Sequence, residues 1–304
     1  MWFRNLFVFR LVQPFALDAD ALSEKLQAAP FQPCGKMERQ SIGFAQPARH
    51  ATAPLAHAVA GNLLLTLCAE DKILPSAVVR DFVDAKVQEI EEQQGRKVGK
   101  KERKELTETV TDELLPRAFT RRRKTTGMIC PQQGWLIVDS ASAKRAEELL
   151  EWLRKTCDSI AVRPLATQLS PVAAMTDWLT GGEAPGNFGM ETEVELKLPE
   201  EDGAVVRCLR QDVHADEVRN HLASGKRVTR LALTWADRLS FVLTEELLIR
   251  RLTYLDLLQD EAKNAGAVDA DEQFDANLTI MAGELAKFLP ELINALGGEQ
   301  AAKN

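Results

Sequence analysis

The stretch LPSAVVRDFVDAKVQEIEEQQGRKVGKKERKELTETVTDELL, residues 74–115, decides how the chain is organised. Pro75 opens a helix in its first turn, where the missing N–H costs nothing. This helix has one apolar stripe at helical spacing, formed by Val79, Phe82, Val83, Val87 and Ile90. A basic turn between Gly95 and Gly99 leads into a second helix, whose apolar side holds Leu106, Val110, Leu114 and Leu115.

Two helices joined by a short loop predict an antiparallel hairpin. Both apolar stripes are narrow and both helices are heavily charged. A helix of this kind buries little of its surface against the rest of a protein. We therefore expect the hairpin to project from the body as an arm.

Strand and helix patterns alternate on both sides of this hairpin. Before it we expect a strand at 3–12, a helix capped by Asp18 and stopped by Pro30, and a strand in NLLLTLCAE at 62–70. After it we expect an extended segment at 119–130, a strand in GWLIVDSAS, a helix in SAKRAEELLEWLRK and a short helix around Trp178. Further strands are expected near 191–198, 203–210, 226–235, 238–243 and 247–252, with helices near 214–223 and 270–295.

These patterns predict an α+β fold with two mixed α/β lobes and a projecting helical hairpin. The central lobe is expected to comprise residues 1–74 plus 118–165, the hairpin 75–117, and the C-terminal lobe 166–304. With 304 residues, 45% hydrophobic and 27% charged, the composition is that of a soluble globular protein.

Composition also excludes some classes of protein. No apolar run reaches the roughly 18 residues that span a bilayer, so we expect no membrane partner. The five cysteines are odd in number, far apart and never in a C-x-x-C pair, which argues against a disulfide framework and a zinc site. A reducing cytoplasm is the expected location.

Charge is unevenly distributed along the chain. The formal net charge is -7, yet residues 96–124 hold eleven cations and five anions. A second basic cluster consists of Arg207, Arg210, Lys226, Arg227 and Arg230. Strand alternation predicts that Lys226 and Arg230 point together from one face of a sheet.

The segment RAFTRRRK, residues 117–124, carries the strongest functional signal. Four consecutive cations repel one another, and no acidic residue within the segment offsets them. A polyanion is their natural counter-charge, and nucleic acid is the commonest one in a cytoplasm. The predicted DNA-binding residues of this region are Arg96, Lys97, Lys100, Lys101, Arg117, Arg121, Arg122, Arg123 and Lys124.

Two alternatives stay open for this region. The turn GRKVGKKERK alternates Lys and Glu as on any exposed helix, and a solvated surface explains it equally well. Phe119 is interpreted as a packing or subunit contact in preference to a base contact, because single-strand binders interleave several aromatic residues. Composition does not decide between duplex and single strand, and the sequence has no recognition-helix motif.

A search for catalytic groups gives one weak candidate. Glu195 and Lys197 form E-x-K on an expected strand, and Asp177 is a second carboxylate for a metal-dependent nuclease. The preferred interpretation is that Glu195 and Lys197 belong to the wet face of an amphipathic strand. His50, His57, His214 and His221 are interpreted as ordinary histidines, and we predict no enzyme activity, cofactor or metal.

Several long strings resemble one family. LLPRAFTR, EDKILPSAVV, PFQPCG, GWLIVDSASAKRAEELL, GKRVTRLALTW and FDANLTIMAGELAKFLPELINALGGE resemble, in the same order and over essentially the whole chain, the bacterial recombination-associated protein RdgC family. The resemblance implies a ring-shaped homodimer with a positively charged hole. It also implies binding of double-stranded DNA without sequence preference, association with the nucleoid and restraint of the strand-exchange protein RecA. No enzyme activity or cofactor is implied.

The resemblance also assigns roles to individual residues. It makes Phe119 part of the subunit contact that gates the ring. It makes Arg210, Gln211 and Lys226 candidates for the DNA-facing surface, with Arg96 as a further candidate. The competing hypotheses are the nuclease described above and a protein-only scaffold in which the basic arm docks an acidic partner.

Overall fold

The computed structural model describes residues 1–48, 53–157, 160–263 and 266–301. One antiparallel sheet runs through this part of the chain in the order β2-β4-β5-β6-β1-β12-β11-β10-β8-β9, while β3 pairs with β4 and β7 with β1. Helices pack on this sheet, so the predicted α+β class is confirmed. Because a single sheet links both predicted lobes, the lobe boundaries stay a prediction. His50 lies outside the described residues.

The first half of the chain supplies one end of the sheet. Its strands are β1 (Leu6–Leu11), β2 (Gln40–Ala45), β3 (Ala56–Val59), β4 (Asn62–Ile73), β5 (Phe119–Cys130), β6 (Trp135–Asp139) and β7 (Val162–Pro164). Its helices outside the arm are α1 (Ala19–Leu26) and α4 (Ala143–Thr156). Asp18 caps α1 as predicted, because its carboxylate accepts a hydrogen bond of 2.8 Å from the Ala21 N–H.

The second half supplies the other end of the sheet. Its strands are β8 (Phe188–Lys197), β9 (Val205–Leu209), β10 (Arg227–Trp235), β11 (Leu239–Thr244) and β12 (Ile249–Tyr254). Its helices are α5 (Pro171–Gly181), α6 (Asp216–Ala223), α7 (Asp256–Lys263) and α8 (Ala270–Ala295). None of the helices in the described residues is long and apolar enough to cross a bilayer.

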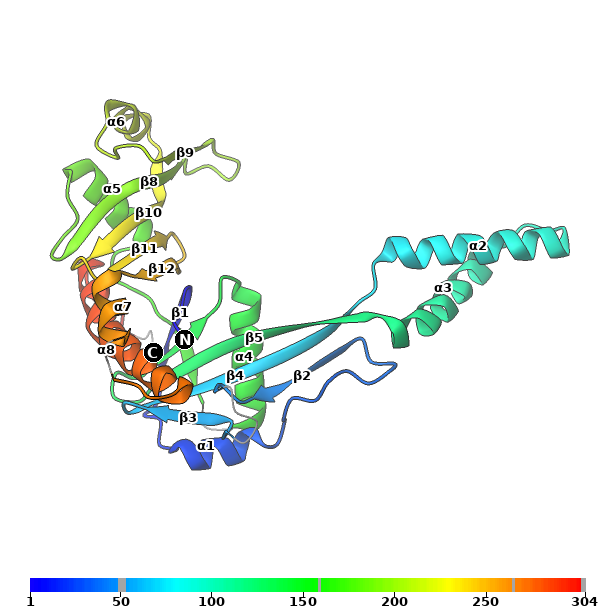
Figure 1. Cartoon of the computed structure of the whole chain (residues 1–304). Coiled ribbons are helices and arrows are strands. Elements are labelled where there is room, and N and C mark those ends of the chain that lie inside the picture. Colours follow the sequence, from blue (N-terminus) through cyan, green and yellow to red (C-terminus); the bar gives the residue numbers. More distant parts are fainter. Residues whose placement is uncertain (49–52, 158–159, 264–265, 302–304) are drawn as a thin grey trace.

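The predicted hairpin stands away from the body at the end of the two longest strands, β4 and β5 (Figure 1). It consists of α2 (Ser76–Gln94) and α3 (Lys100–Leu114), followed by the 3-10 turn η1 (Leu115–Arg117). Its separate core centres on three buried valines, Val79, Val83 and Val110. Gly95 ends α2 in the left-handed conformation that glycine adopts without strain.

The two faces of the sheet enter different cores. Leu64 and Met128 are registered partners, and they belong to the core that includes α5 and α8. Leu65 and Ile129, one residue further along each strand, belong to the core that includes α1 and α4. Strand alternation therefore decides which side chains of β4 and β5 face each layer. At the far end of the sheet, the core side of β8 and β10 again packs on α5.

Candidate nucleic-acid interface

The four consecutive cations of β5 alternate between the two faces of the sheet. Register pairs Arg121 with Asp71, Arg122 with Glu70 and Arg123 with Ala69. No acid within the segment offsets these cations, but β4 brings acidic residues alongside them from about 50 residues away in the sequence. A stretch that is uniformly basic in sequence is thereby mixed in charge in the folded sheet.

Glu70 is the centre of the first acid–base contact. It is 2% exposed, forms an ion pair with Arg122, and accepts a hydrogen bond of 2.9 Å from the Cys34 N–H. These hydrogen bonds, that of Arg122 first, hold the pKa of Glu70 below its usual value. The Arg122 guanidinium also lies 5.4 Å from the ring centre of Phe31. Arg122 is therefore held by the fold.

Arg123 is held in the same way on the opposite face. It forms an ion pair with Asp71 and a second one, at 3.2 Å, with Glu148 of α4. By contrast, Arg117, Arg121 and Lys124 are exposed and have no recorded ion pair with any described residue. Of the predicted cations in this segment, these three remain available to an external anion.

Two of the four predicted cations in and after the turn of the arm are also paired. The Arg96 guanidinium donates two hydrogen bonds of 2.7 Å to Glu102, and Lys97 lies 2.9 Å from Glu91. Lys100 and Lys101 are exposed, and no ion pair with a described residue is recorded for either. The solvated-surface interpretation thus fits Arg96 and Lys97 better than Lys100 and Lys101.

Two of the C-terminal cations, Arg207 and Arg230, share one carboxylate, that of Glu195 on β8. Arg207 donates to it at 2.5 Å, Thr229 at 3.0 Å, and the Arg230 guanidinium lies 3.6 Å away. Burial alone would raise the pKa of Glu195, but the hydrogen bonds from Arg207 and Thr229 hold this pKa below its usual value.

The prediction that Lys226 and Arg230 point together is wrong. A register shift lies between Val228 and Arg230, because Val228 pairs with Leu196 while Arg230 pairs with Glu195. Such a bulge adds one residue to the strand and reverses the alternation beyond it. Arg230 consequently lies on the face of Arg227 and Arg207, whereas Lys226 precedes β10 and lies outside the sheet.

The remaining predicted residues lie at the edges of this region. Lys226 donates a hydrogen bond of 3.1 Å to Ser224, and Gln211 donates one of 3.4 Å to Glu217. Arg210 and Arg227 are exposed, with no ion pair recorded in the described part of the chain. Arg210 has a φ of 56°, a left-handed conformation that is uncommon for arginine and is found more often at functional sites.

The proposed nuclease residues do not come together. Asp177 lies on α5, which packs on the core face of β8 and β10. Glu195 and Lys197 lie on the other face of β8, since Val194 and Leu196 occupy the core face. In addition, the Glu195 carboxylate forms ion pairs with Arg207 and Arg230, which compete with a metal ion for it. No cluster of His, Cys, Asp and Glu fit for a metal ion is found among the described residues.

Sequence reasoning missed two sets of cations. Arg251 of β12 has a φ of 52° and lies 2.6 Å from Glu193 of β8, so it extends the C-terminal cluster across the sheet. Arg39, Lys72 and Arg80 surround the root of the arm together with Arg103. Isolated cations of this kind form no run in the sequence, and no local signal indicates them.

Known proteins match this sequence over nearly the full chain. A family model described as "RdgC: Putative exonuclease, RdgC" matches residues 1–299. The chain belongs to the RdgC family. Curated RdgC relatives named "Recombination-associated protein RdgC" include one from Pseudomonas paraeruginosa that is 48% identical over 301 residues, with 99% of this chain and 98% of the relative covered. One from Bordetella parapertussis is 46% identical over 300 residues, with 99% of each chain covered.

The two descriptions of the RdgC family differ in what they say. The relatives carry the name of a recombination-associated protein, which is not an enzyme name, whereas the family model carries the words "putative exonuclease". Membership thus connects this chain to recombination. It does not by itself decide whether an RdgC protein cleaves DNA.

Proposed function

We propose that this chain is a non-enzymatic protein that binds double-stranded DNA without sequence preference and restrains RecA-mediated strand exchange in recombination and replication fork repair. The proposal includes closure of two copies into a ring around the duplex and association with the nucleoid. The observation that carries it is that seven of the predicted DNA-binding residues are exposed cations with no acidic partner recorded among the described residues. They are Lys100 and Lys101 in the arm, Arg117, Arg121 and Lys124 on η1 and β5, and Arg210 and Arg227 in the second half of the chain.

Such a distribution suits a polyanion that has no preferred sequence. Phosphate contacts from lysine and arginine supply affinity but carry no sequence information. Among the described helices, none packs on the face of β8 and β10 that carries Arg207, Arg227 and Arg230, and these side chains are exposed or half-buried. An extended anion such as a duplex therefore has access to them.

An exposed apolar patch at the root of the arm supports contact between two copies. Phe119 is 85% exposed and its registered partner Ile73 is 46% exposed, while Val78 and Phe82 of α2 are also exposed. An exposed apolar patch of this kind marks an interaction surface. We assign the patch to the contact that opens and closes the proposed ring, with Phe119 at its centre.

DNA binding is tested with an arbitrary fluorescent duplex across a salt series, with magnesium present and product lengths checked. We expect sequence-independent binding that falls by about 10³-fold between 50 and 200 mM salt if about six phosphates are contacted. Absence of binding at low salt would contradict the proposal. Shortened products that require magnesium would instead favour the exonuclease that the family description names.

The ring is tested with Phe119→Ala on closed circular DNA and on linear fragments of the same sequence. Loss of the gate contact should change loading on circles more than binding to linear DNA. Val268→Ala, at another strongly exposed apolar residue, is the matched control and should change neither. An equal loss of binding to circular and linear DNA would contradict the assignment of Phe119 to a contact that opens and closes the ring.

Restraint of RecA is tested by adding the protein to a RecA strand-exchange reaction. Competition for DNA predicts that extra duplex relieves the inhibition, whereas direct contact with RecA predicts inhibition that extra duplex does not relieve. No inhibition at concentrations that saturate the DNA would contradict this part of the proposal.

A further inference from the structure

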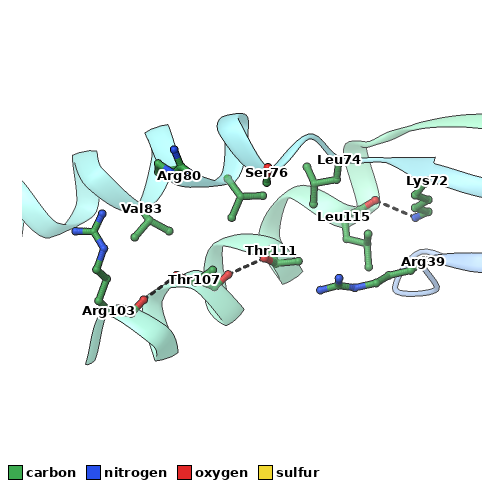
Figure 2. Close-up of a pocket in the computed structure, with 11 residues that line it drawn as sticks. Arg39, Lys72, Leu74, Ser76, Arg80, Val83, Arg103, Thr107, Thr111 and Leu115 are labelled. Carbon is green, nitrogen blue, oxygen red and sulfur yellow. Dashed lines mark hydrogen bonds between the residues drawn. The ribbon is translucent and has the colours of Figure 1, made fainter. Parts of the chain in front are cut away.

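A groove of about 520 Å³ lies at the root of the arm between α2 and α3. Its apolar lining comes from Leu74, Val79, Val83 and Leu115. Three hydroxyl-bearing residues, Ser76, Thr107 and Thr111, also line it. Two of these hydroxyls are already used within α3, since Thr111 donates to the Thr107 carbonyl and Thr107 to the Arg103 carbonyl (Figure 2).

The charged residues that line the groove are all cations. They are Arg39, Lys72, Arg80 and Arg103, and no carboxylate of a described residue is part of the lining. Figure 2 shows Arg39 and Lys72 near one end of the groove and Arg80 and Arg103 toward the other. A ligand in the groove would thus meet positive charge at both ends and apolar side chains between them.

These cations are only partly compensated. Arg103 pairs with Asp84 of α2, and this ion pair is exposed. The Lys72 ammonium donates to two backbone carbonyls, those of Lys36 at 2.6 Å and Leu115 at 2.9 Å, so no carboxylate neutralises it. Arg39 and Arg80 are exposed, and no acidic partner for either is recorded in the described part of the chain. The groove therefore retains a net positive charge.

The apolar residues that line the groove favour a peptide over DNA as its ligand. A phosphodiester backbone offers charge but no apolar side chain to fill a lined groove. A peptide offers both, because carboxylates bind arginine in two-point hydrogen bonds while a leucine or phenylalanine between them buries apolar surface. The positive potential at both ends would also speed the encounter with an acidic segment.

We propose that this groove binds an acidic peptide segment of a partner protein, with a bulky apolar side chain placed between carboxylates. The segment lies along the arm between α2 and α3. Arg39 and Lys72 receive its carboxylates at one end, and Arg80 and Arg103 receive those at the other. Its apolar side chain lies against Leu74, the least buried of the apolar lining residues. This site is independent of the proposed DNA contacts, so either proposal can fail alone.

The test uses the full chain and a fluorescein-labelled peptide, Gly-Asp-Asp-Leu-Phe-Leu-Asp-Asp-Gly, with fluorescence anisotropy as the readout. We expect saturable binding that the double variant Arg39→Glu, Arg80→Glu weakens by at least about tenfold, because two charge-assisted contacts become repulsive. Arg154→Glu, an exposed arginine of α4, is the matched control and should change binding less than about twofold. Arg39→Met with Arg80→Met removes the charges without adding repulsion and should also weaken binding.

Two matched peptides separate charge from apolar contact. Replacing every Asp by Asn should abolish binding, and replacing the Leu-Phe-Leu centre by three alanines should weaken it by at least about tenfold. Equal binding of all three peptides would overturn the proposal, as would wild-type affinity in both double variants.

Two other occupants of the groove would also overturn it. If the double variants lose duplex affinity and keep peptide affinity, the groove is a DNA contact. If they change the sedimentation mass of the protein and keep peptide affinity, the groove is a contact between copies of this chain. Urea unfolding of each variant checks that it remains folded in each of these experiments.

Discussion

On β5, Arg122 meets a buried carboxylate of the neighbouring strand, whereas on β10 Arg230 shares the carboxylate of Glu195 with Arg207. Glu70 is almost fully buried and also accepts a backbone N–H, so it must keep its partners. Glu195 has two arginines competing for it near the surface. The first arrangement makes arginine part of the fold, and the second leaves arginine able to exchange its partner for a phosphate.

The largest effect should follow from removing the buried acid. Glu70→Ala leaves Arg122 and the Cys34 N–H without their acceptor, and we expect the free energy of unfolding to fall by about 1–3 kcal/mol at pH 7. Urea unfolding measures this loss. Glu147→Ala, at an exposed glutamate of α4, should change stability little. An equal change in the free energy of unfolding for both variants would mean that Glu70 stabilises the fold no more than an exposed glutamate does.

The acid pH dependence should change with the same residue. The folded-state pKa of Glu70 is lowered, so its stabilising ion pair is fully present above the unfolded-state pKa. This contribution is lost as pH falls through the folded-state pKa. Glu70→Gln should therefore lose less stability than the wild type between neutral pH and about pH 3. Parallel stability curves over that range would rule out this role.

Next in size is the effect on DNA binding of the unpaired cations on β5. Arg121 and Lys124 lie on opposite faces of β5, so we expect one of the single variants Arg121→Ala and Lys124→Ala to reduce the slope of log affinity against log salt by about 1 and the other to leave it unchanged. Arg122→Ala should lower stability and leave the slope unchanged, because Glu70 already neutralises that arginine. A slope that Arg122→Ala also flattens would mean that DNA displaces Glu70.

A smaller effect of opposite sign is expected on the C-terminal sheet. Glu195→Gln releases Arg207 and Arg230 from a competing anion and should raise duplex affinity by about twofold to fivefold at low salt. Glu200→Gln makes the same charge change in the exposed β8–β9 connection and is the matched control. Affinity that rises equally in both variants would indicate only a general effect of net charge.

The smallest effect is expected at the turn of the arm. Arg96 and Glu102 are an exposed pair, and exposed pairs contribute little to stability. Arg96→Ala should leave the thermal midpoint unchanged and alter the salt slope less than Lys100→Ala does. If Arg96→Ala has the larger effect on the slope, the turn contacts DNA through Arg96 in preference to Lys100.

Local patterns were enough to predict most elements of this fold. The narrow stripes of residues 74–115 predicted the arm, and its separate core contains Val79, Val83 and Val110 from those stripes. Asp18 predicted the start of α1, and the apolar run at 62–70 predicted the buried part of β4. These signals are local because helix and strand periods are read within one segment.

The partners of the basic residues were not predictable in the same way. Glu70 and Arg122 are 52 positions apart, and only the pairing of β4 with β5 brings them together. The bulge at Val228–Arg230 changes which cations share a face, and nothing in KRVTRLALTW indicates it. Arg39, Lys72, Arg80 and Arg103 meet at one groove from four separate segments.

The sequence by itself determined most of the helices and strands, the projecting arm, and the family to which the chain belongs, but it did not indicate β2, β3, β7 or α7. Periodicity, caps and turn residues act over a few positions, so one chain displays them without its fold. Only the tertiary structure decided which cations are neutralised and which remain available to an anion. That outcome depends on strand register, and a shift of one residue moves a side chain to the opposite face of the sheet.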